Sequence, residues 1–179
     1  MNKDRGWSTK GGVMFLSTHE DKDIITPQSG MIEEFWHEAV EYGEAHANVT
    51  LPVMIEEYLT KTLMQYIREV FFMDTPIAIH FLEGLKENDL VRLAQGASAS
   101  LLILGPFPER TKRMLVSPSY LLYAGRSSYD HLALRFETIH LTHDAALARK
   151  ARDSFEPMAR VLRGMRMKEN IFTLPILDD

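Results

Sequence analysis

From Ser29 onward, apolar residues recur at spacings of three and four, which is the period of an amphipathic helix and not the spacing of two that strands require. Residues that start and stop helices stand between these periodic segments at regular intervals. The pattern predicts an all-α fold with about six helices. A chain of 179 residues can bury a core of its own, so we expect a single domain.

Capping residues and prolines mark the expected helix boundaries. The expected helices end near residues 47, 73, 86, 104, 140 and 168. Four have predicted N-terminal caps, at Ser29, Thr50, Asn88 and Thr142, and the other two start at the segments 74–76 and 117–118. Pro157 should kink or break the last helix, with Asp153 as a fresh cap. The boundaries therefore divide the chain into an irregular N-terminal arm, residues 1–30, and a helical domain, residues 31–179.

The sequence also supports separate predictions for the arm, for two short segments and for the tail. The arm is polar and shows no sustained period, so it should contain at most a short strand over residues 13–16. Residues 96–100 have side chains small enough for another backbone to approach closely, and residues 105–108 contain too many glycines and prolines to be helical. The tail over residues 171–179 should pack as an extended strap.

Composition excludes several classes of protein. The chain has no cysteine, which rules out a disulfide scaffold, a cysteine-ligated metal and a thiol nucleophile, and which favours a reducing compartment. It has no apolar run of signal-peptide or membrane-spanning length, so we expect a cytoplasmic protein with no membrane partner. The net charge is −5, but residues 1–90 carry −9 and residues 91–179 carry +4. The two halves can therefore pair with each other or serve a charged partner.

Residues 101–133 combine a Gly-x-Phe-Pro-Glu turn, an arginine, a tyrosine-rich helix start, a glycine and a Tyr-x-x-Leu sequence. The residues concerned are Gly105, Phe107, Pro108, Glu109, Arg113, Tyr120, Gly125, Tyr129 and Leu132. This order resembles the middle of a family of small all-helical bacterial proteins, over residues 51–133, and departs from it at Pro106. The resemblance implies a bacterial origin and an all-helical fold, and it implies no activity.

A partner or ligand surface is predicted where tyrosine and arginine gather on one helix. Its residues are Tyr120, Tyr123, Arg126 and Tyr129. Tyrosine and arginine supply rigid contact area and several donors at interfaces, and the small residues between them allow close approach. The alternative is that the rings fill the core and bond their hydroxyls to the backbone of the Phe107–Pro108 turn.

Two Glu-x-x-His motifs form a candidate metal site. They are Glu34 with His37 and Glu137 with His140. The spacing i, i+3 presents a carboxylate and an imidazole to one point, and helical di-iron proteins use two such motifs with one further glutamate from each of two other helices. Here those glutamates would be Glu56, Glu69 or Glu83. The alternative is that all of these side chains lie on solvated helix faces, and no cofactor is otherwise expected.

The last helix carries a basic face that could follow phosphates. Its residues are Arg149, Arg152, Arg160 and Arg163. Glu156 within this stretch, the negative net charge and the lack of a helix-turn-helix sequence oppose nucleic-acid binding. Pairing with the acidic helix that contains Glu34 to Glu44 is a simpler use.

The interpretation that these observations favour is a non-catalytic binding or assembly protein that self-associates or binds another protein. Ten methionines and several apolar residues outside regular stripes suit contacts with other chains. The alternatives are an enzyme or sensor with a metal or small-ligand site in the bundle, and a nucleic-acid accessory protein. The sequence has no Gly-x-Ser-x-Gly elbow and no glycine-rich phosphate loop, so it leans away from catalysis.

Overall fold

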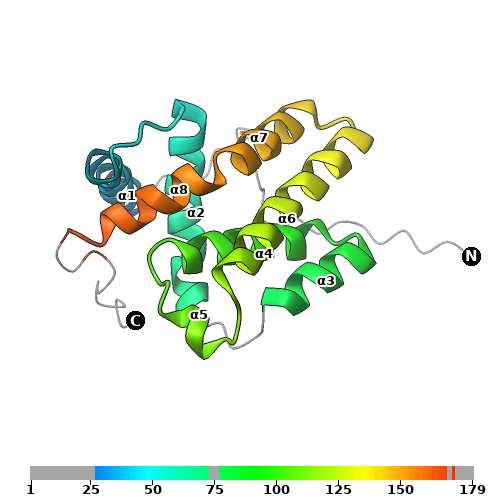
Figure 1. The fold of residues 1–179 in the computed structure, drawn as a ribbon. Coiled ribbons are helices and arrows are strands. Elements are labelled where there is room, and N and C mark those ends of the chain that lie inside the picture. Colours follow the sequence, from blue (N-terminus) through cyan, green and yellow to red (C-terminus); the bar gives the residue numbers. More distant parts are fainter. Residues whose placement is uncertain (1–26, 73–76, 169–170, 172–179) are drawn as a thin grey trace, which may run out of the picture.

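The computed structural model describes residues 27–72, 77–168 and 171 (Figure 1). Within them the chain forms helices and no strand, which confirms the all-α prediction. The helices are α1 (Pro27–Ala47), α2 (Val53–Phe72), α3 (Ile77–Glu87), α4 (Leu90–Leu104), α5 (Arg110–Arg113), α6 (Pro118–Thr138), α7 (Thr142–Asp153) and α8 (Phe155–Met165). These are eight helices in the described part of the chain, not about six, because the last helix is divided and α5 adds a single turn.

Helix α4 is the centre of the fold, and α2, α3, α6 and α8 all pack against it. It is almost wholly buried from Leu93 to Ile103, and it includes the small-residue segment over 96–100. An added Cβ at Gly125 of α6 would lie 3.2 Å from the Cβ of Ser100 and would overlap the ring of Phe155. The predicted close approach of another backbone to this segment is therefore confirmed, and the backbone is that of α6.

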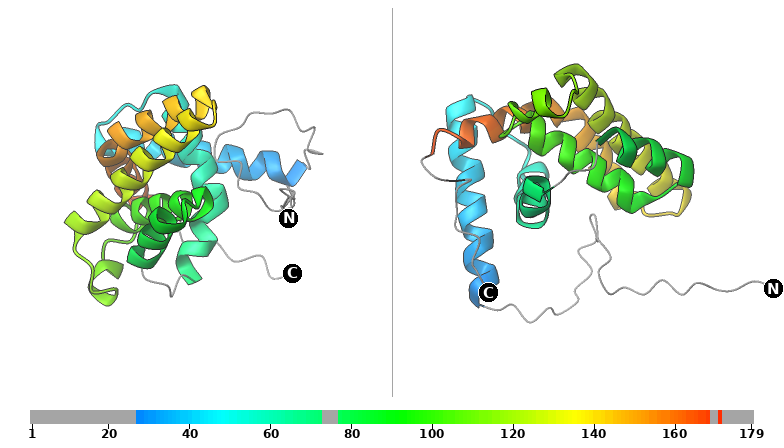
Figure 2. Two further views of the ribbon diagram at one scale, coloured as in Figure 1. Left: turned by 90° about the vertical axis from the view of Figure 1, so that its right-hand side faces the viewer. Right: turned by 90° about the horizontal axis from the view of Figure 1, so that it is seen from below.

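Helix α1 crosses α8 through a second close contact, which involves two glycines. A Cβ added at Gly43 would lie 2.5 Å from the carbonyl oxygen of Val161, and one added at Gly164 would lie 2.5 Å from the carbonyl oxygen of Gly43. Figure 2 shows α8 crossing the C-terminal half of α1, while the N-terminal half of α1 extends away from the other helices. Because neither glycine has a side chain, the backbones of α1 and α8 contact each other directly at this crossing.

Two of the predicted caps stand one residue from the observed ones. Asn88 has a φ of 54° and terminates α3, while the Asp89 side chain accepts hydrogen bonds from the backbone N–H groups of Val91 and Arg92 and caps α4. Thr142 is the first residue of α7 and not its cap. The helix start predicted at Ser117 and Pro118 is confirmed, and the Ser117 hydroxyl caps α6 by accepting a hydrogen bond from the N–H of Tyr120.

The break that Pro157 predicts lies at Ser154, which separates α7 from α8. Asp153 is the last residue of α7, so it does not cap the next helix. Pro157 stands in the first turn of α8. Backbone N–H groups in the first turn have no acceptor within the helix, so the missing N–H group of proline costs little there. The proline therefore starts a new helix instead of kinking a continuous one.

The expected N-terminal arm lies largely outside the described residues, as do the strand over 13–16, the restart at 74–76 and the tail beyond Ile171. Helix α1 begins at Pro27, inside the expected arm, so Ser29 lies within the helix and does not cap it. Ile171 itself is buried. Across the described helices, none combines the length and apolar character that crossing a membrane requires.

We predict that Gly43→Ala destabilises the fold by about 1–3 kcal/mol, because its methyl group would overlap the backbone of α8. Gly30→Ala on the same helix is the matched control, since an added Cβ there meets no atom within 4 Å. The control should be neutral or stabilising by up to about 1 kcal/mol. Urea denaturation of both variants measures the difference, and equal stabilities would contradict the glycine crossing.

Candidate functional site

The predicted tyrosine and arginine surface is only partly exposed. Tyr123 is 62% exposed, and its ring meets the ring of Phe81 on α3 edge to face, with 6.2 Å between centroids. Arg126 is exposed, and Tyr120 is half-buried. Burial, followed by the nearby Tyr123, raises the pKa of Tyr120. Of these three residues, Tyr123 and Arg126 are accessible to a partner, and Tyr120 is only partly accessible.

Tyr129 does not belong to the surface, and its assignment there was wrong. It is fully buried, its hydroxyl lies 2.7 Å from that of Tyr58 on α2, and its ring packs edge to face on Phe155. Burial raises the pKa of Tyr58, so this hydroxyl stays protonated and can donate. The core alternative holds for this ring, and its hydroxyl joins α6 to α2.

The exposed stripe of α6 extends along the whole helix. We call it the outer face of α6. Its exposed residues are Ser119, Tyr123, Arg126, Asp130, Leu134 and Glu137, and the half-buried Ser127 lies among them. They recur at spacings of three, four, seven and eleven, which place them on one side of a helix. Leu134 is 53% exposed, and the sequence pattern did not predict it as part of the surface. Its spacing of eleven residues from Tyr123 places it on the same face of the helix.

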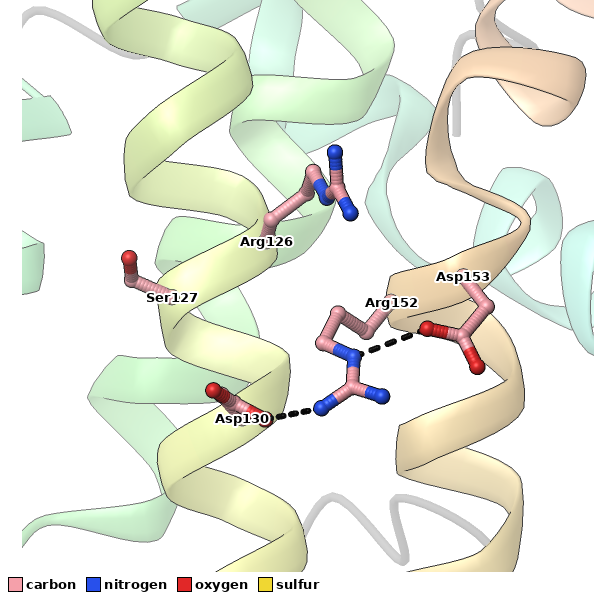
Figure 3. Close-up of a pocket in the computed structure, with 5 residues that line it drawn as sticks. All are labelled: Arg126, Ser127, Asp130, Arg152 and Asp153. Carbon is pink, nitrogen blue, oxygen red and sulfur yellow. Dashed lines mark hydrogen bonds and ion pairs between the residues drawn. The ribbon is translucent and has the colours of Figure 1, made fainter.

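A shallow depression of 310 Å³ lies between α6 and α7 along this face (Figure 3). Its lining residues are Arg126, Ser127, Asp130, Arg152 and Asp153. Arg152 pairs with Asp130 and donates from Nε to Asp153 over 2.9 Å. The depression thus brings together one residue of the predicted partner surface and one of the predicted basic face.

Arg126 differs from Arg152 in this depression. It forms no ion pair with any residue in the described ranges, although Asp130 stands four residues later on the same helix. Asp130 is directed to α7 instead, through Arg152. The guanidinium of Arg126 is therefore free to pair with a group from outside the chain.

The predicted basic face is partly neutralised within the chain. Arg149 pairs with Glu137 of α6, and the hydrogen bond from this guanidinium lowers the pKa of the glutamate. Arg163 donates from Nε to the carbonyl oxygen of Ala159, and Arg160 is exposed. Among the described residues no ion pair joins these arginines to the acidic face of α1, and Arg149 and Arg152 pair with α6 instead.

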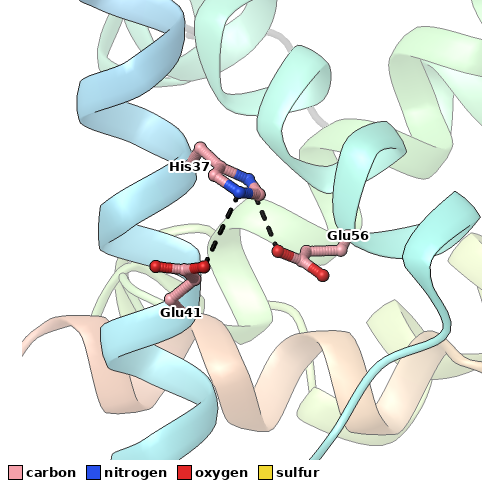
Figure 4. A group of neighbouring side chains, drawn as sticks. All are labelled: His37, Glu41 and Glu56. Atoms are coloured by element: carbon pink, nitrogen blue, oxygen red, sulfur yellow. Dashed lines mark ion pairs between the residues drawn. The ribbon is translucent and has the colours of Figure 1, made fainter.

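The two Glu-x-x-His motifs do not combine as predicted. The imidazole of His37 lies between two other carboxylates, with Nε2 3.7 Å from Glu41 and Nδ1 3.4 Å from Glu56 (Figure 4). These three side chains are the one group in the described chain whose potential metal ligands lie within 4.8 Å of one another. Neither Glu34 nor the second motif joins it.

The second motif lies at the end of α6. Glu137 is exposed and is paired with Arg149, and His140 is exposed and has a φ of 62° just after the helix. A left-handed residue at this position ends the helix, so Glu137 and His140 do not share the continuous helical turn that the motif requires. Glu83, one of the further candidate ligands, pairs with Arg92, and the side chain of Glu69 lies outside the described residues.

The group formed by His37, Glu41 and Glu56 is best described as an ion-paired junction between α1 and α2. Each imidazole nitrogen faces a different carboxylate, Glu41 on the same helix and Glu56 on α2. Burial, then the charge of Glu44, raises the pKa of Glu56, while His37 acts in the opposite direction.

We predict that the Tyr58 and Tyr129 hydroxyls are energetically coupled. Each single change to Phe should cost about 1–2 kcal/mol, because one hydroxyl loses a buried partner. The double variant Tyr58→Phe with Tyr129→Phe should cost less than the sum of the two. A double-mutant cycle by urea denaturation measures the coupling, and strict additivity would contradict the hydrogen bond.

No protein-family model, curated protein or solved structure matches this chain. The comparisons therefore assign the chain to no family. The resemblance stated for residues 51–133 gains no support from them.

Proposed function

We propose that this chain is a non-catalytic binding protein that assembles with a second copy of itself through the outer face of α6. The observation that carries the proposal is the exposure of Tyr123 and Leu134 on a helix whose other large apolar side chains are mostly buried. Exposed aromatic and aliphatic side chains on one face, with an arginine between them, are typical of the centre of a protein interface.

The polar residues of this face also suit an interface. Arg126, Ser127 and Asp130 provide both donors and acceptors between Tyr123 and Leu134. Interfaces that form specifically combine apolar anchors with paired polar groups, because unpaired charges would oppose association. The face therefore combines exposed apolar side chains with charges of opposite sign.

The two alternative functions have weaker support. A metal-binding enzyme or sensor would use Glu34, His37, Glu137 and His140, and these residues do not form one group. A nucleic-acid accessory protein would need free cations, and both Arg149 and Arg152 are engaged with carboxylates of the same chain. Each such pair reduces the positive charge available to phosphates.

We predict that the protein dimerises and that Tyr123→Ser and Leu134→Ser each weaken the dimer at least tenfold, because each removes an apolar anchor worth about 1.4 kcal/mol or more. Sedimentation velocity over a range of concentrations measures the dissociation constant. Leu115→Ser is the matched control, since Leu115 is 94% exposed and lies outside α6. It should leave the dissociation constant unchanged.

A monomer at about 100 µM would contradict self-association, since any dimer more stable than about 5.5 kcal/mol would be populated at that concentration. A dimer that responds to Leu115→Ser and not to the two α6 variants would place the interface elsewhere.

A further inference from the structure

This inference rests on the proposed function and adds the geometry of the interface. We propose that two copies dock α6 against α6 in antiparallel orientation, across a two-fold axis that passes near Ser127. Each Arg126 then pairs with Asp130 of the partner subunit, and each Tyr123 packs against Leu134 of the partner subunit.

The order of residues on the outer face of α6 carries the proposal. The helix covers Pro118–Thr138, so its midpoint is residue 128. Arg126 and Asp130 stand two residues on either side of that midpoint, and Tyr123 and Leu134 stand five and six residues from it. At 1.5 Å per residue, the charged pair lies about 3 Å from the midpoint and the apolar pair about 7.5–9 Å from it.

A two-fold axis makes use of this arrangement. In an isologous interface a residue that meets a second one is met by it in return, so complementary residues must be equally far from the axis. Reversal of α6 about its midpoint brings Arg126 opposite Asp130 and Tyr123 opposite Leu134. The face is therefore complementary to its own reversed copy in both charge and apolar character.

Charge also selects the direction of docking. Parallel helices in register would place Arg126 against Arg126 and Asp130 against Asp130, which is repulsive. The antiparallel arrangement replaces both repulsions by attractions and supplies a partner for Arg126, which has none in the described chain. Asp130 keeps Arg152 as a neighbour, and its carboxylate has a second oxygen that can accept from Arg126 of the partner subunit.

The middle of the face permits the close approach that such pairing requires. Ser127 is small and half-buried, so it does not hold the two helices apart. The depression between α6 and α7 is open along the same face, and it is lined by Arg126 and Asp130 themselves. Docking would cover it with the partner subunit.

Charge reversal tests the pairing. Arg126→Glu should weaken the homodimer at least tenfold, because each of the two symmetric contacts then places two carboxylates against each other. Asp130→Arg should weaken it to the same extent, because each contact then places two guanidinium groups against each other. An equimolar mixture of the two variants should form a heterodimer with a dissociation constant within about tenfold of the unmodified protein, since both contacts become attractive again. Native mass spectrometry distinguishes the heterodimer from both homodimers by mass.

Two controls and a second rescue variant accompany this experiment. Arg160→Glu makes the same change of charge at an exposed residue of α8, and it should leave the dimer intact. The thermal unfolding midpoint of each variant reports whether it folds. The double variant Arg126→Glu with Asp130→Arg exchanges both charges, so two copies of it should attract each other again and form a homodimer.

The outcomes separate this inference from the proposed function. A dimer that Tyr123→Ser weakens, but in which neither the mixture nor the double variant recovers affinity, would overturn the antiparallel pairing and retain self-association through α6. A protein that is monomeric without any substitution would overturn both.

Discussion

The close approach of α4 and α6 at Ser100 and Gly125 determines which side of α6 is buried and which is exposed. Because Gly125 has no side chain, the ring of Phe155 and the Cβ of Ser100 occupy the space beside the helix backbone. Tyr129 then enters the core and reaches Tyr58, and Tyr123 and Leu134 are left on the opposite side. The outer face of α6 is a consequence of this contact.

The ion pairs of the molecule reinforce the same arrangement. Arg149 and Arg152 of α7 pair with Glu137 and Asp130 of α6, so α7 is held beside the outer face without covering it. Exposed pairs of this kind contribute little to stability, because solvent screens them. They also neutralise two of the four arginines of the predicted basic face, Arg149 and Arg152.

Local signals predicted much of the fold because they act within one turn of a helix. Ser117 with Pro118 started α6 as expected, and Gly105 ended α4. The choice between Asn88 and Asp89 could not be made from the sequence, since both residue types cap helices and end them. The site was predicted less well. Placing Tyr129 required its contact with Tyr58, which is 71 residues away, and the junction at His37 required the packing of α2 on α1.

The position of the two-fold axis is the central claim, and the chain offers a direct measurement because it contains no cysteine. Ser127→Cys introduces a single thiol that lies within a few residues of the axis. Ser119→Cys introduces one on the same face about 27 Å, measured along the helices, from its copy in the partner subunit. Mild oxidation should give a disulfide-linked dimer of the first variant and not of the second. Equal cross-linking of both variants, or cross-linking of Ser119→Cys alone, would contradict the account.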